Sequence, residues 1–598
     1  MDLKSISDRL GSRRATALAL ALAALVVASI LVVPFYTSRS VPGPDGKTVS
    51  KPLTTHDMAQ HLAVMSQFDL VMRTGSIYPR WQPDFNKGYG LAWTNFYQPG
   101  FFYQTSLVNL LFKDWVKTLF ALSILGLAAS GLTFYLLARL FYDGWASAVA
   151  ALLYMLLPYH TLDLYWRGAM PELQGFILVP LILYFAFKAG AEAKAHHIAG
   201  LGLFYGLYLL THFPVAYLLS YTLVLYALIW GFSARDWKIV LRLGVGMSLG
   251  LMLSAIYLVP ASLEYKHTHE HFTTIFPYHD SYITLMPTKD AFRALLDISF
   301  IGQTMALIAA LVILALLARG YDRRVESSGE ASRGEATKRM QTRLMIAIGV
   351  FTTFMSTSFS IYISRLIPKI ESVSFAWRWL VITGFFAALL FAAAIDRFRN
   401  HKEMSVRQKW AYGTVIALVV VLNIWITTKS IIGGALSNGP LNPPPNHIEE
   451  AFIPKGGTSP REMPDTPIAM TLPEGGIVEV VRWEPLHREV GVSNTAPAVL
   501  RLRTYNFPGW VARVDGNDAQ ILSDKDGAQL IPIEPGKHKV EVRFASTPPR
   551  TAGAAITILG FLIILGLIGA SYYRGKRGDT GRPAEPIEQP AEETAVAG

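Results

Sequence analysis

The sequence predicts a mainly α-helical, polytopic membrane protein that carries a small extracytoplasmic antiparallel β-sandwich near its C-terminus. Of its 598 residues, 52% are hydrophobic and 16% are charged, whereas soluble globular chains carry about 25% charged residues. The apolar residues gather in runs, several of them long enough for a helix to cross about 30 Å of hydrocarbon. Between 431 and 549 the runs give way to the alternation of apolar and polar residues that is typical of strands.

Twelve apolar runs predict about 12 transmembrane helices. The runs cover residues 15–36, 116–140, 145–158, 172–190, 197–211, 214–232, 239–260, 300–318, 344–360, 375–396, 410–430 and 551–573. The first run follows a basic N-terminus, but it is longer than the apolar part of a signal peptide, so we expect it to remain as a span. Residues 1–430 should form one transmembrane domain, and 550–573 should form the last span.

The distribution of charge predicts the topology. Much of the net charge of +11 lies in short basic segments between apolar runs, such as 319–343 and 397–409, and such loops are typical of the cytoplasmic side. Topology therefore accounts for the excess positive charge, and no nucleic-acid partner is expected. If the apolar segment 100–112 lies along the membrane, all strongly basic loops fall on one side. We then expect a multi-pass protein of the inner (plasma) membrane, with both termini cytoplasmic.

The segment 431–549 is expected to be an extracytoplasmic domain between two spans. After a linker rich in proline, glycine and asparagine, strands are predicted at 477–483, 499–505, 510–514, 529–533 and 539–544. The dipeptides Asp515-Gly516, Asp526-Gly527 and Pro535-Gly536 supply turns between them. The tail 574–598 is rich in proline, glutamate and alanine, and we expect it to be disordered in the cytoplasm.

The first outer loop, residues 37–99, holds the leading candidate for chemistry. Asp57 stands between His56 and His61, directly after a span, and ionisable groups at a membrane face are a functional hypothesis by default. Asp57 could accept a proton from an attacking hydroxyl, with the histidines tuning or binding. The alternative is that Asp57 caps an amphipathic helix over 58–72.

Residue types also limit the chemistry. The chain has no cysteine, which excludes disulfides, a thiol nucleophile and a thiolate metal site. It has no glycine-rich phosphate loop of the nucleotide-hydrolysing type. His267, His269 and His271 alternate along one outer loop and would share a face if the chain is extended there. A solvated polar loop is the alternative, so a divalent metal ion stays open as a cofactor.

Several short motifs, taken in order, resemble a known family. They are Asp57 in the first outer loop, Tyr78-Pro79-Arg80-Trp81, Asn86 with Gly88-Tyr89-Gly90, Phe96-Tyr97-Gln98-Pro99, Arg167-Gly168-Ala169-Met170-Pro171-Glu172, Phe375-Ala376-Trp377-Arg378-Trp379 and Tyr505-Asn506-Phe507-Pro508-Gly509-Trp510. Together they resemble the membrane proteins labelled 6-pyruvoyl-tetrahydropterin synthase-related and the neighbouring YfhO-like proteins. Both resemble branches of the GT-C glycosyltransferases, which take sugars from polyprenyl-phosphate carriers. The pterin label implies no pterin chemistry here, and Gln98-Pro99-Gly100 departs from the more usual double proline.

The resemblance implies a GT-C-like transmembrane domain and places Asp57 where those enzymes carry the catalytic aspartate. The substrate-binding candidates are His56, His61, Arg80, Trp81, Asn86, Tyr89, Tyr97, Arg167, Glu172 and Arg378. Arg167 could grip a lipid-linked phosphate, or it could snorkel to lipid headgroups with Glu172 as its neutraliser. For Arg378, the alternative is an anchor within an aromatic belt. Asp57 is expected to face a cavity shared with the 78–98 loop and Arg167.

The expected function is inverting transfer of a sugar from a polyprenyl-phosphate donor to an envelope glycan, lipid or polymer. The reaction would take place at the outer face of the inner membrane. Asp57 would be the base, and Arg167 with Arg80 or Arg378 would stabilise the departing phosphate. The β-sandwich would orient the acceptor, and membrane lipids would surround the spans. The alternatives are a transporter or flippase for lipid-linked glycans, which needs ionisable groups near the midplane, and a non-catalytic envelope scaffold.

Overall fold

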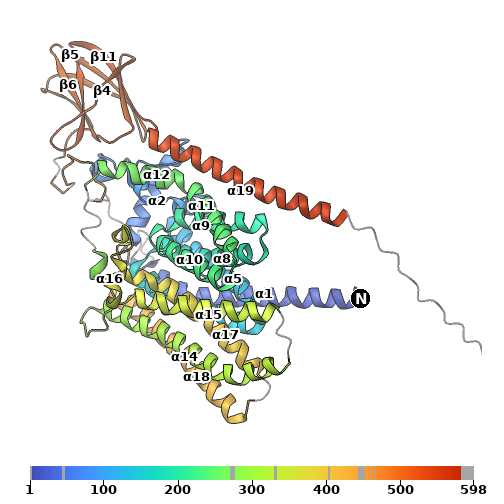
Figure 1. The fold of residues 1–598 in the computed structure, drawn as a ribbon. Coiled ribbons are helices and arrows are strands. Elements are labelled where there is room, and N and C mark those ends of the chain that lie inside the picture. The colour runs from blue at the N-terminus through green and yellow to red at the C-terminus, as the bar shows by residue number, and fades with distance from the viewer. Residues whose placement is uncertain are drawn as a thin grey trace, which may run out of the picture.

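The computed structural model describes residues 3–42, 48–269, 277–328, 333–401, 404–441, 451–459, 461–462 and 465–580. Figure 1 shows a bundle of helices with a β-sandwich beyond one end, and the long last helix returning along the outside of the bundle. His271 and the part of the predicted tail after Thr580 lie outside the described residues.

Helices cover most of each of the twelve apolar runs, and the run 239–260 is divided between two helices. The helices are α1 (Leu3–Thr37), α5 (Trp115–Ala138), α6 (Gly144–Met155), α8 (Met170–Glu192), α9 (Ala195–Thr211), α10 (Phe213–Ala234), α11 (Trp237–Leu253), α12 (Ala255–Glu264), α14 (Ala291–Ser328), α15 (Arg333–Met355), α17 (Trp379–Asn400), α18 (Val406–Ser437) and α19 (Pro548–Thr580). Among the described residues, nine helical segments are long and apolar enough to cross a membrane, and α11 with α12 makes a tenth if that bent pair is one span. The predicted polytopic helical fold is confirmed.

Two of the predicted runs fall short of a full span for identifiable reasons. α9 has 17 residues, about 26 Å at 1.5 Å per residue. The first half of α15 carries five charged residues between Arg333 and Arg343. Conversely, α4 (Gly100–Phe112) is only 13 residues long, about 20 Å, which is too short for a full span.

Prolines inside the helices have compensating hydrogen bonds. Pro180 of α8 has no N–H for the carbonyl of Phe176, and Tyr154 Oη donates to that carbonyl instead, at 3.2 Å.

A serine stands at the bend between α11 and α12, which meet at an angle of 68°. The Ser254 hydroxyl donates to the carbonyl of Gly250 at 2.9 Å. Such back-bonding by serine often bends helices.

The C-terminal domain is the predicted antiparallel β-sandwich. Its strands are β3 (Ala469–Leu472), β4 (Ile477–Glu484), β5 (His487–Asn494), β6 (Ala498–Tyr505), β7 (Trp510–Val514), β8 (Asn517–Ala519), β9 (Leu522–Ser523), β10 (Ala528–Ile533) and β11 (Gly536–Phe544). One sheet has the order β3-β6-β10-β9 and the other β4-β5-β11-β7-β8. A separate hairpin, β1 (Arg39–Pro42) with β2 (Thr48–Lys51), follows the first span.

The β5 strand was missed because one of its inward-facing residues is charged. Arg488, Val490 and Val492 are the buried residues of the alternating pattern. The Arg488 guanidinium lies over the rings of Trp483 and Trp510, at 4.5 and 5.4 Å from their centroids. These cation–π contacts let a cation stand where the sequence pattern demands an apolar residue.

The sandwich docks on the first outer loop through aromatic side chains. Trp81 is 0% exposed, and its ring centroid lies 5.3 Å from that of Trp510 and 5.5 Å from that of Phe544. The Tyr89 carbonyl accepts from the N–H of Tyr505 at 2.8 Å. The loop around α2 (Met58–Arg73) and α3 (Trp93–Phe96) is therefore covered by the β-sandwich, which comes from the C-terminal part of the chain.

We expect Trp81→Ala to loosen this junction. Truncating a buried tryptophan typically costs about 3–5 kcal/mol of unfolding free energy, so the purified variant should melt at a lower temperature and its sandwich should become accessible to protease. Trp410→Ala is the matched control, because Trp410 is 73% exposed. Equal melting temperatures for the two variants would show that Trp81 does not hold the domains together.

Candidate functional site

A tight bend between two spans brings Arg167 beside the first outer loop. α7 (Pro158–Leu162) begins with a proline, which is pre-set for a first helical turn, and continues as a single π-turn, η2 (Asp163–Arg167). Gly168 ends it with φ +63°, a conformation that glycine adopts without strain. A Cβ at position 168 would lie 2.0 Å from Thr55 Oγ1, so glycine permits this close approach.

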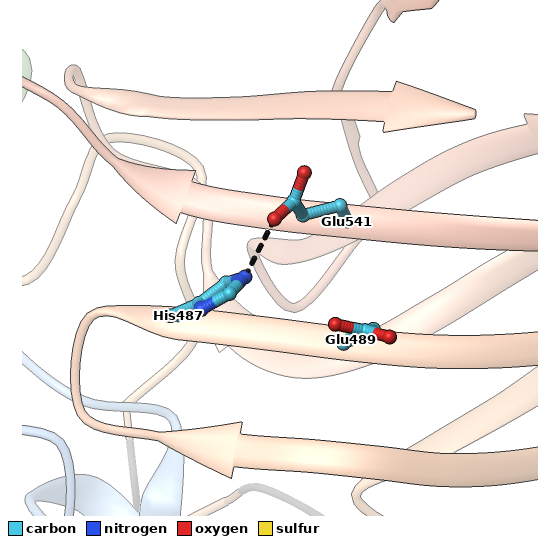
Figure 2. A group of neighbouring side chains, drawn as sticks. All are labelled: His487, Glu489 and Glu541. Carbon is cyan, nitrogen blue, oxygen red and sulfur yellow. Dashed lines mark hydrogen bonds and ion pairs between the residues drawn. The ribbon is translucent and has the colours of Figure 1, made fainter. Parts of the chain in front are cut away.

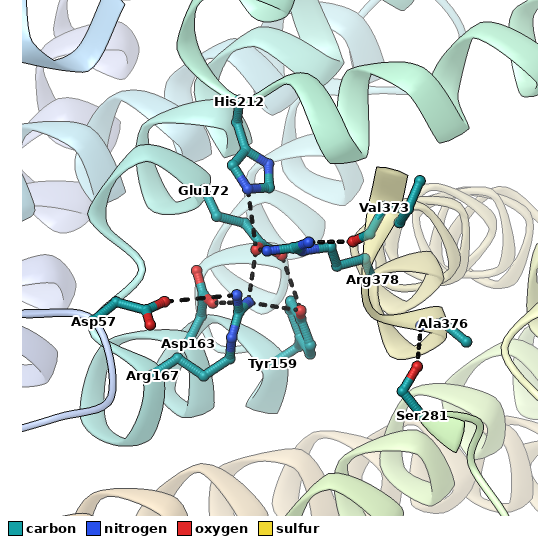
Figure 3. Close-up of polar contacts among 10 residues, drawn as sticks. All are labelled: Asp57, Tyr159, Asp163, Arg167, Glu172, His212, Ser281, Val373, Ala376 and Arg378. Carbon is teal, nitrogen blue, oxygen red and sulfur yellow. Dashed lines mark hydrogen bonds and ion pairs between the residues drawn. The ribbon is translucent and has the colours of Figure 1, made fainter. Parts of the chain in front are cut away.

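Backbone hydrogen bonds hold Asp57 against the bend. Its N–H donates to the carbonyl of Arg167 at 2.8 Å, and the N–H of His56 donates to the carbonyl of Trp166 at 3.2 Å. Asp57 precedes α2, but its side chain makes no capping hydrogen bond, so the alternative that this side chain serves as a helix cap is wrong. The carboxylate instead faces Arg167, with Oδ2 4.0 Å from Nη2 (Figure 3).

Arg167 is a buried cation between two buried carboxylates. Its side chain is 3% exposed, and Nη1 lies 2.7 Å from Asp163 Oδ1 and 2.6 Å from Glu172 Oε2. The same nitrogen donates to Tyr159 Oη at 3.3 Å. Close pairing of this kind is what makes buried charges tolerable. The burial contradicts the alternative that Arg167 snorkels to lipid headgroups.

Glu172 extends these contacts from α8 to α17. Its Oε2 lies 3.4 Å from Arg378 Nε and 3.5 Å from His212 Nε2, and Tyr159 Oη donates to its Oε1 at 2.9 Å. Arg378 ends the short turn η7 (Ala376–Arg378) before α17. We call this set the Arg167 cluster: Asp57, Tyr159, Asp163, Arg167, Glu172, His212 and Arg378 (Figure 3).

The turn that carries Arg378 is itself fixed by hydrogen bonds. Ser281 Oγ accepts from the N–H of Ala376 at 2.6 Å, and the Arg378 guanidinium donates to the carbonyl of Val373. The guanidinium carbon also lies 5.0 Å from the centroid of the Phe375 ring. Arg378 is therefore a buried member of the cluster, and the alternative of an anchor in an exposed aromatic belt is wrong.

Asp57 differs from the other acids of the cluster in its access to solvent. Its side chain is 38% exposed, whereas those of Asp163 and Glu172 are 0% exposed. The two inner carboxylates are engaged by Arg167 at hydrogen-bond distance, and Asp57 is held at a longer one. A reactant hydroxyl could therefore reach Asp57 and could not reach the inner pair.

The two histidines next to Asp57 are neutral bases. Burial lowers the pKa of His61 to about 4, against an opposing effect of the Asp57 carboxylate and a smaller effect of Arg167 in the same direction as burial. Burial also lowers the pKa of His56. Neither side chain can then supply a positive charge at neutral pH. Positive charge in the cluster comes from Arg167 and Arg378.

A cavity of about 410 Å³ reaches the cluster from the side of Arg378. Its polar lining includes His212 and Arg378, together with Tyr97 of the first outer loop and Lys369. Apolar and aromatic side chains complete most of the wall: Phe96, Phe213, Pro214, Tyr257, Leu258, Ala261, Tyr265 and Phe452. Asp57 and Arg167 are not in this lining, so of the residues expected to share a cavity with Asp57, only the end of the 78–98 loop is present.

Four predicted binding residues make their contacts elsewhere. Arg80 donates to Asn95 Oδ1 at 3.0 Å and to the carbonyl of Ile256 at 2.8 Å, the carbonyl that Pro260 of α12 cannot bond. Trp81 and Tyr89 contact the sandwich. We therefore assign these residues to packing.

Asn86 also belongs to the structural part of this loop. It is fully buried and has φ +54°, and asparagine is among the residues that tolerate this left-handed conformation. The adjacent glycine, Gly88, has Arg503 of the sandwich 3.7 Å from the position of a Cβ. The Asn86-Gly88 turn therefore fits the first outer loop to the β-sandwich.

Sequence reasoning missed three members of the cluster. Asp163 stands four residues before Arg167, a spacing that brings side chains together on a helix, and Tyr159 lies one turn earlier. His212, which we would take for a helix-end histidine, lies between α9 and α10 with Nδ1 buried and without a hydrogen-bond partner among the described residues. The i,i+4 pair was a usable signal. The role of His212 depends on tertiary structure.

A second group of ionisable residues lies on the sandwich. His487, Glu489 and Glu541 have potential ligand atoms within 4.8 Å of one another (Figure 2). Lys539 Nζ lies 2.8 Å from Glu489 Oε1, and Arg543 Nε donates to Glu541 Oε1 at 2.8 Å. A metal would have to displace these cations. We assign the group to surface ion pairing on β5 and β11.

Comparisons with known proteins identify the family of the chain and a solved structure to which it is similar. A family model described as 6-pyruvoyl-tetrahydropterin synthase related domain, membrane protein, matches residues 94–436. No curated protein matches the chain. The chain is similar to the cryo-electron microscopy structure of arabinofuranosyltransferase AftD from Mycobacteria, with a TM-score of 0.42 and 17% identity, over 70% of this chain and 27% of that chain. It thus spans about a quarter of the length of that protein.

Gly168→Ala should move Asp57 away from Arg167. The added methyl has no room beside Thr55 and also demands a strained backbone, so we expect a lower melting temperature and a displaced first outer loop. Gly75→Ala is the matched control, because Gly75 has φ +91° but nothing within 4 Å of a Cβ. The difference between the two melting temperatures measures the steric part. The proposed close approach is refuted if the two variants behave alike.

His61 should make folding sensitive to mild acid. Its pKa in the folded protein, about 4, lies below the ordinary histidine value of 6.5, so the unfolded chain binds the proton more readily. The stabilising contribution is complete above pH 6.5 and is lost as the pH falls toward 4, amounting to a loss on the order of 3 kcal/mol. Melting curves of wild type and His61→Gln between pH 7 and pH 4 check this. The variant should lose less stability, and parallel curves would contradict the prediction.

Proposed function

The chain belongs to the 6-pyruvoyl-tetrahydropterin synthase related family of membrane proteins, and from this premise we propose that it is a GT-C-type membrane glycosyltransferase. It would move a sugar from a polyprenyl-phosphate donor to an envelope glycan, lipid or polymer. The observation that carries the proposal is the pairing of one partly exposed carboxylate, Asp57, with two buried guanidinium groups beside an aromatic cavity.

The reaction would be a single displacement. The acceptor hydroxyl attacks the anomeric carbon of the donor while Asp57 accepts its proton, and the bond from that carbon to the phosphate oxygen breaks. The new glycosidic bond forms with inverted configuration, and polyprenyl phosphate leaves with the bonding electrons. Asp57 suits the role of base because it alone among the three acids of the cluster is open to a reactant.

The donor phosphate would lie in the 410 Å³ cavity. Arg378 and Lys369 bring two positive charges to a wall that is otherwise largely apolar, and these charges would stabilise the leaving phosphate. The aromatic wall would contact the first isoprene units. This assigns the phosphate to Arg378 rather than to Arg167, whose Nη1 already donates to Asp163, Glu172 and Tyr159.

Arg167 would act as a positioning residue. It joins Asp57 on one side to Glu172 on the other, and Glu172 in turn contacts Arg378 (Figure 3). Base and phosphate-binding groups are thereby set on opposite sides of one rigid cluster. The acceptor at Asp57 and the donor at Arg378 would thus be positioned relative to one another by the same rigid set of contacts, which favours displacement.

The sandwich would present the acceptor. A groove of about 870 Å³ along its inner edge is lined by side chains suited to sugar hydroxyls, among them Asn506, Arg513 and Asp518. The sandwich and the C-terminal ends of α14 and α17 lie at opposite ends of the bundle (Figure 1). With the basic connections cytoplasmic, the site and sandwich would face outward from the inner membrane, with both termini inside.

Asp57→Asn should abolish transfer and leave folding intact. Loss of a general base typically costs about 10²–10⁴-fold in rate, and Asp57 makes no capping bond that asparagine could weaken. The assay is release of polyprenyl phosphate by purified protein from a panel of polyprenyl-phosphate sugars, with an acceptor extract of envelope glycans.

Asp114→Asn is the contrasting control, because Asp114 does cap a helix, accepting from the N–H of Lys117 at 3.0 Å. It should keep transfer. Full activity of Asp57→Asn would remove Asp57 from the mechanism. If wild type transfers no sugar from any donor and a deletion strain keeps its envelope glycans unchanged, the scaffold alternative is favoured.

A further inference from the structure

A second cavity lies at the end of the bundle away from the Arg167 cluster. It encloses about 270 Å³ between α14, α15 and α17, next to the turn after α5. Leu314 and Leu317 of α14 form part of one wall, Lys338 and Arg339 come from α15, and Arg397 comes from α17. The cavity takes no part in the proposed transfer reaction.

The ends of the spans place this cavity at the surface of the bilayer. The apolar part of α14 ends before Arg319, the span containing α17 ends at Asn400, and α5 ends at Ala138. The lining residues Leu317, Asn400 and Phe141 stand within a turn of these ends. A cavity at this level meets lipid headgroups rather than acyl-chain ends or bulk solvent.

The lining of this cavity combines basic side chains with apolar ones. Lys338, Arg339 and Arg397 contribute three positive charges against one carboxylate, Asp396. Asp396 is already engaged, because its Oδ1 accepts from the N–H of Asp143 at 2.9 Å and from Asn400 at 3.3 Å. By composition, the lining thus carries more cationic side chains than carboxylates.

We propose that this cavity binds the headgroup of an anionic phospholipid, such as phosphatidylglycerol. Its phosphate would contact Lys338, Arg339 and Arg397, and its glycerol and upper acyl chain would lie on Leu314 and Leu317. Basic pockets between transmembrane helices bind anionic headgroups in this way. A zwitterionic lipid brings its own positive group and fits less well. The bound lipid would tie α15, the helix with the charged first half, to α14 and α17.

The test is native mass spectrometry of the full-length protein in detergent with phosphatidylglycerol or phosphatidylcholine. The pocket variant is Lys338→Gln with Arg397→Gln. The control variant is Arg407→Gln with Lys409→Gln, which removes two charges from exposed positions of the same basic region. Both variants have the same net charge. A difference in lipid binding between them is therefore due to the cavity and not to the electrostatic field of the whole protein.

We expect wild type and the control variant to bind phosphatidylglycerol alike and the pocket variant to bind it roughly 30-fold more weakly. If the double variant does not fold, Lys338→Gln alone should lose roughly 5-fold, and Lys338→Arg with Arg397→Lys should retain binding.

Equal losses in the pocket and control variants, or phosphatidylcholine bound as well as phosphatidylglycerol, would overturn the proposal. Displacement of phosphatidylglycerol from wild type by inorganic phosphate at comparable concentration would instead identify a site for a soluble anion, which also overturns it.

Discussion

The burial of Arg167 between Asp163 and Glu172 is the constraint on which the rest of the site depends. Removing one partner of a buried ion pair typically costs about 3–5 kcal/mol, because the other charge is left uncompensated. Arg167 has two such partners within hydrogen-bond distance. The bend after α7 and the N-terminus of α8 must therefore keep their relative positions. Glu172 carries the same requirement to α17 through Arg378.

This constraint also explains why a partly exposed acid can stand beside two buried ones. Asp163 and Glu172 neutralise Arg167 from within the protein, and the Asp57 carboxylate is left at the outer edge with only a 4.0 Å contact to it. The backbone hydrogen bond from Asp57 to Arg167 fixes the position of the acid without occupying its side chain. The backbone atoms of Asp57 thus fix its position, and its side chain stays open to solvent.

The parts of the structure that follow local patterns were predictable, and those that rest on long-range pairing were not. Apolar runs gave the helices and alternation gave most strands, but Arg488 concealed β5 because its aromatic partners come from other strands. Asp57, Arg167, Glu172 and Arg378 were predicted as site residues and lie in one cluster. His212 joins them only through the packing of α9 and α10 against α8.

The lack of long-range information in the sequence also explains why Arg80, Trp81 and Tyr89 were grouped with the site residues, whereas the structure places them at the domain junction. Aromatic and basic residues in an outer loop suggest a ligand surface, and the sequence does not show that another domain covers them. Trp81 packs on Trp510 and Phe544, and Tyr89 bonds Arg501 at 3.1 Å. A conspicuous motif at a domain junction and one at a binding site draw on the same residue types.

The contact between Tyr89 and Arg501 can form only after the sandwich has been synthesised, long after the first outer loop. The two residues are 412 positions apart, and at about 5–20 residues per second the ribosome needs roughly 20 to 80 s to make the second after the first. During that interval the aromatic face of the first loop has no partner, since its cover is not yet synthesised. The aromatic face of the loop thus stays exposed until the sandwich folds. A chain that terminates early leaves this face open to aggregation or proteolysis.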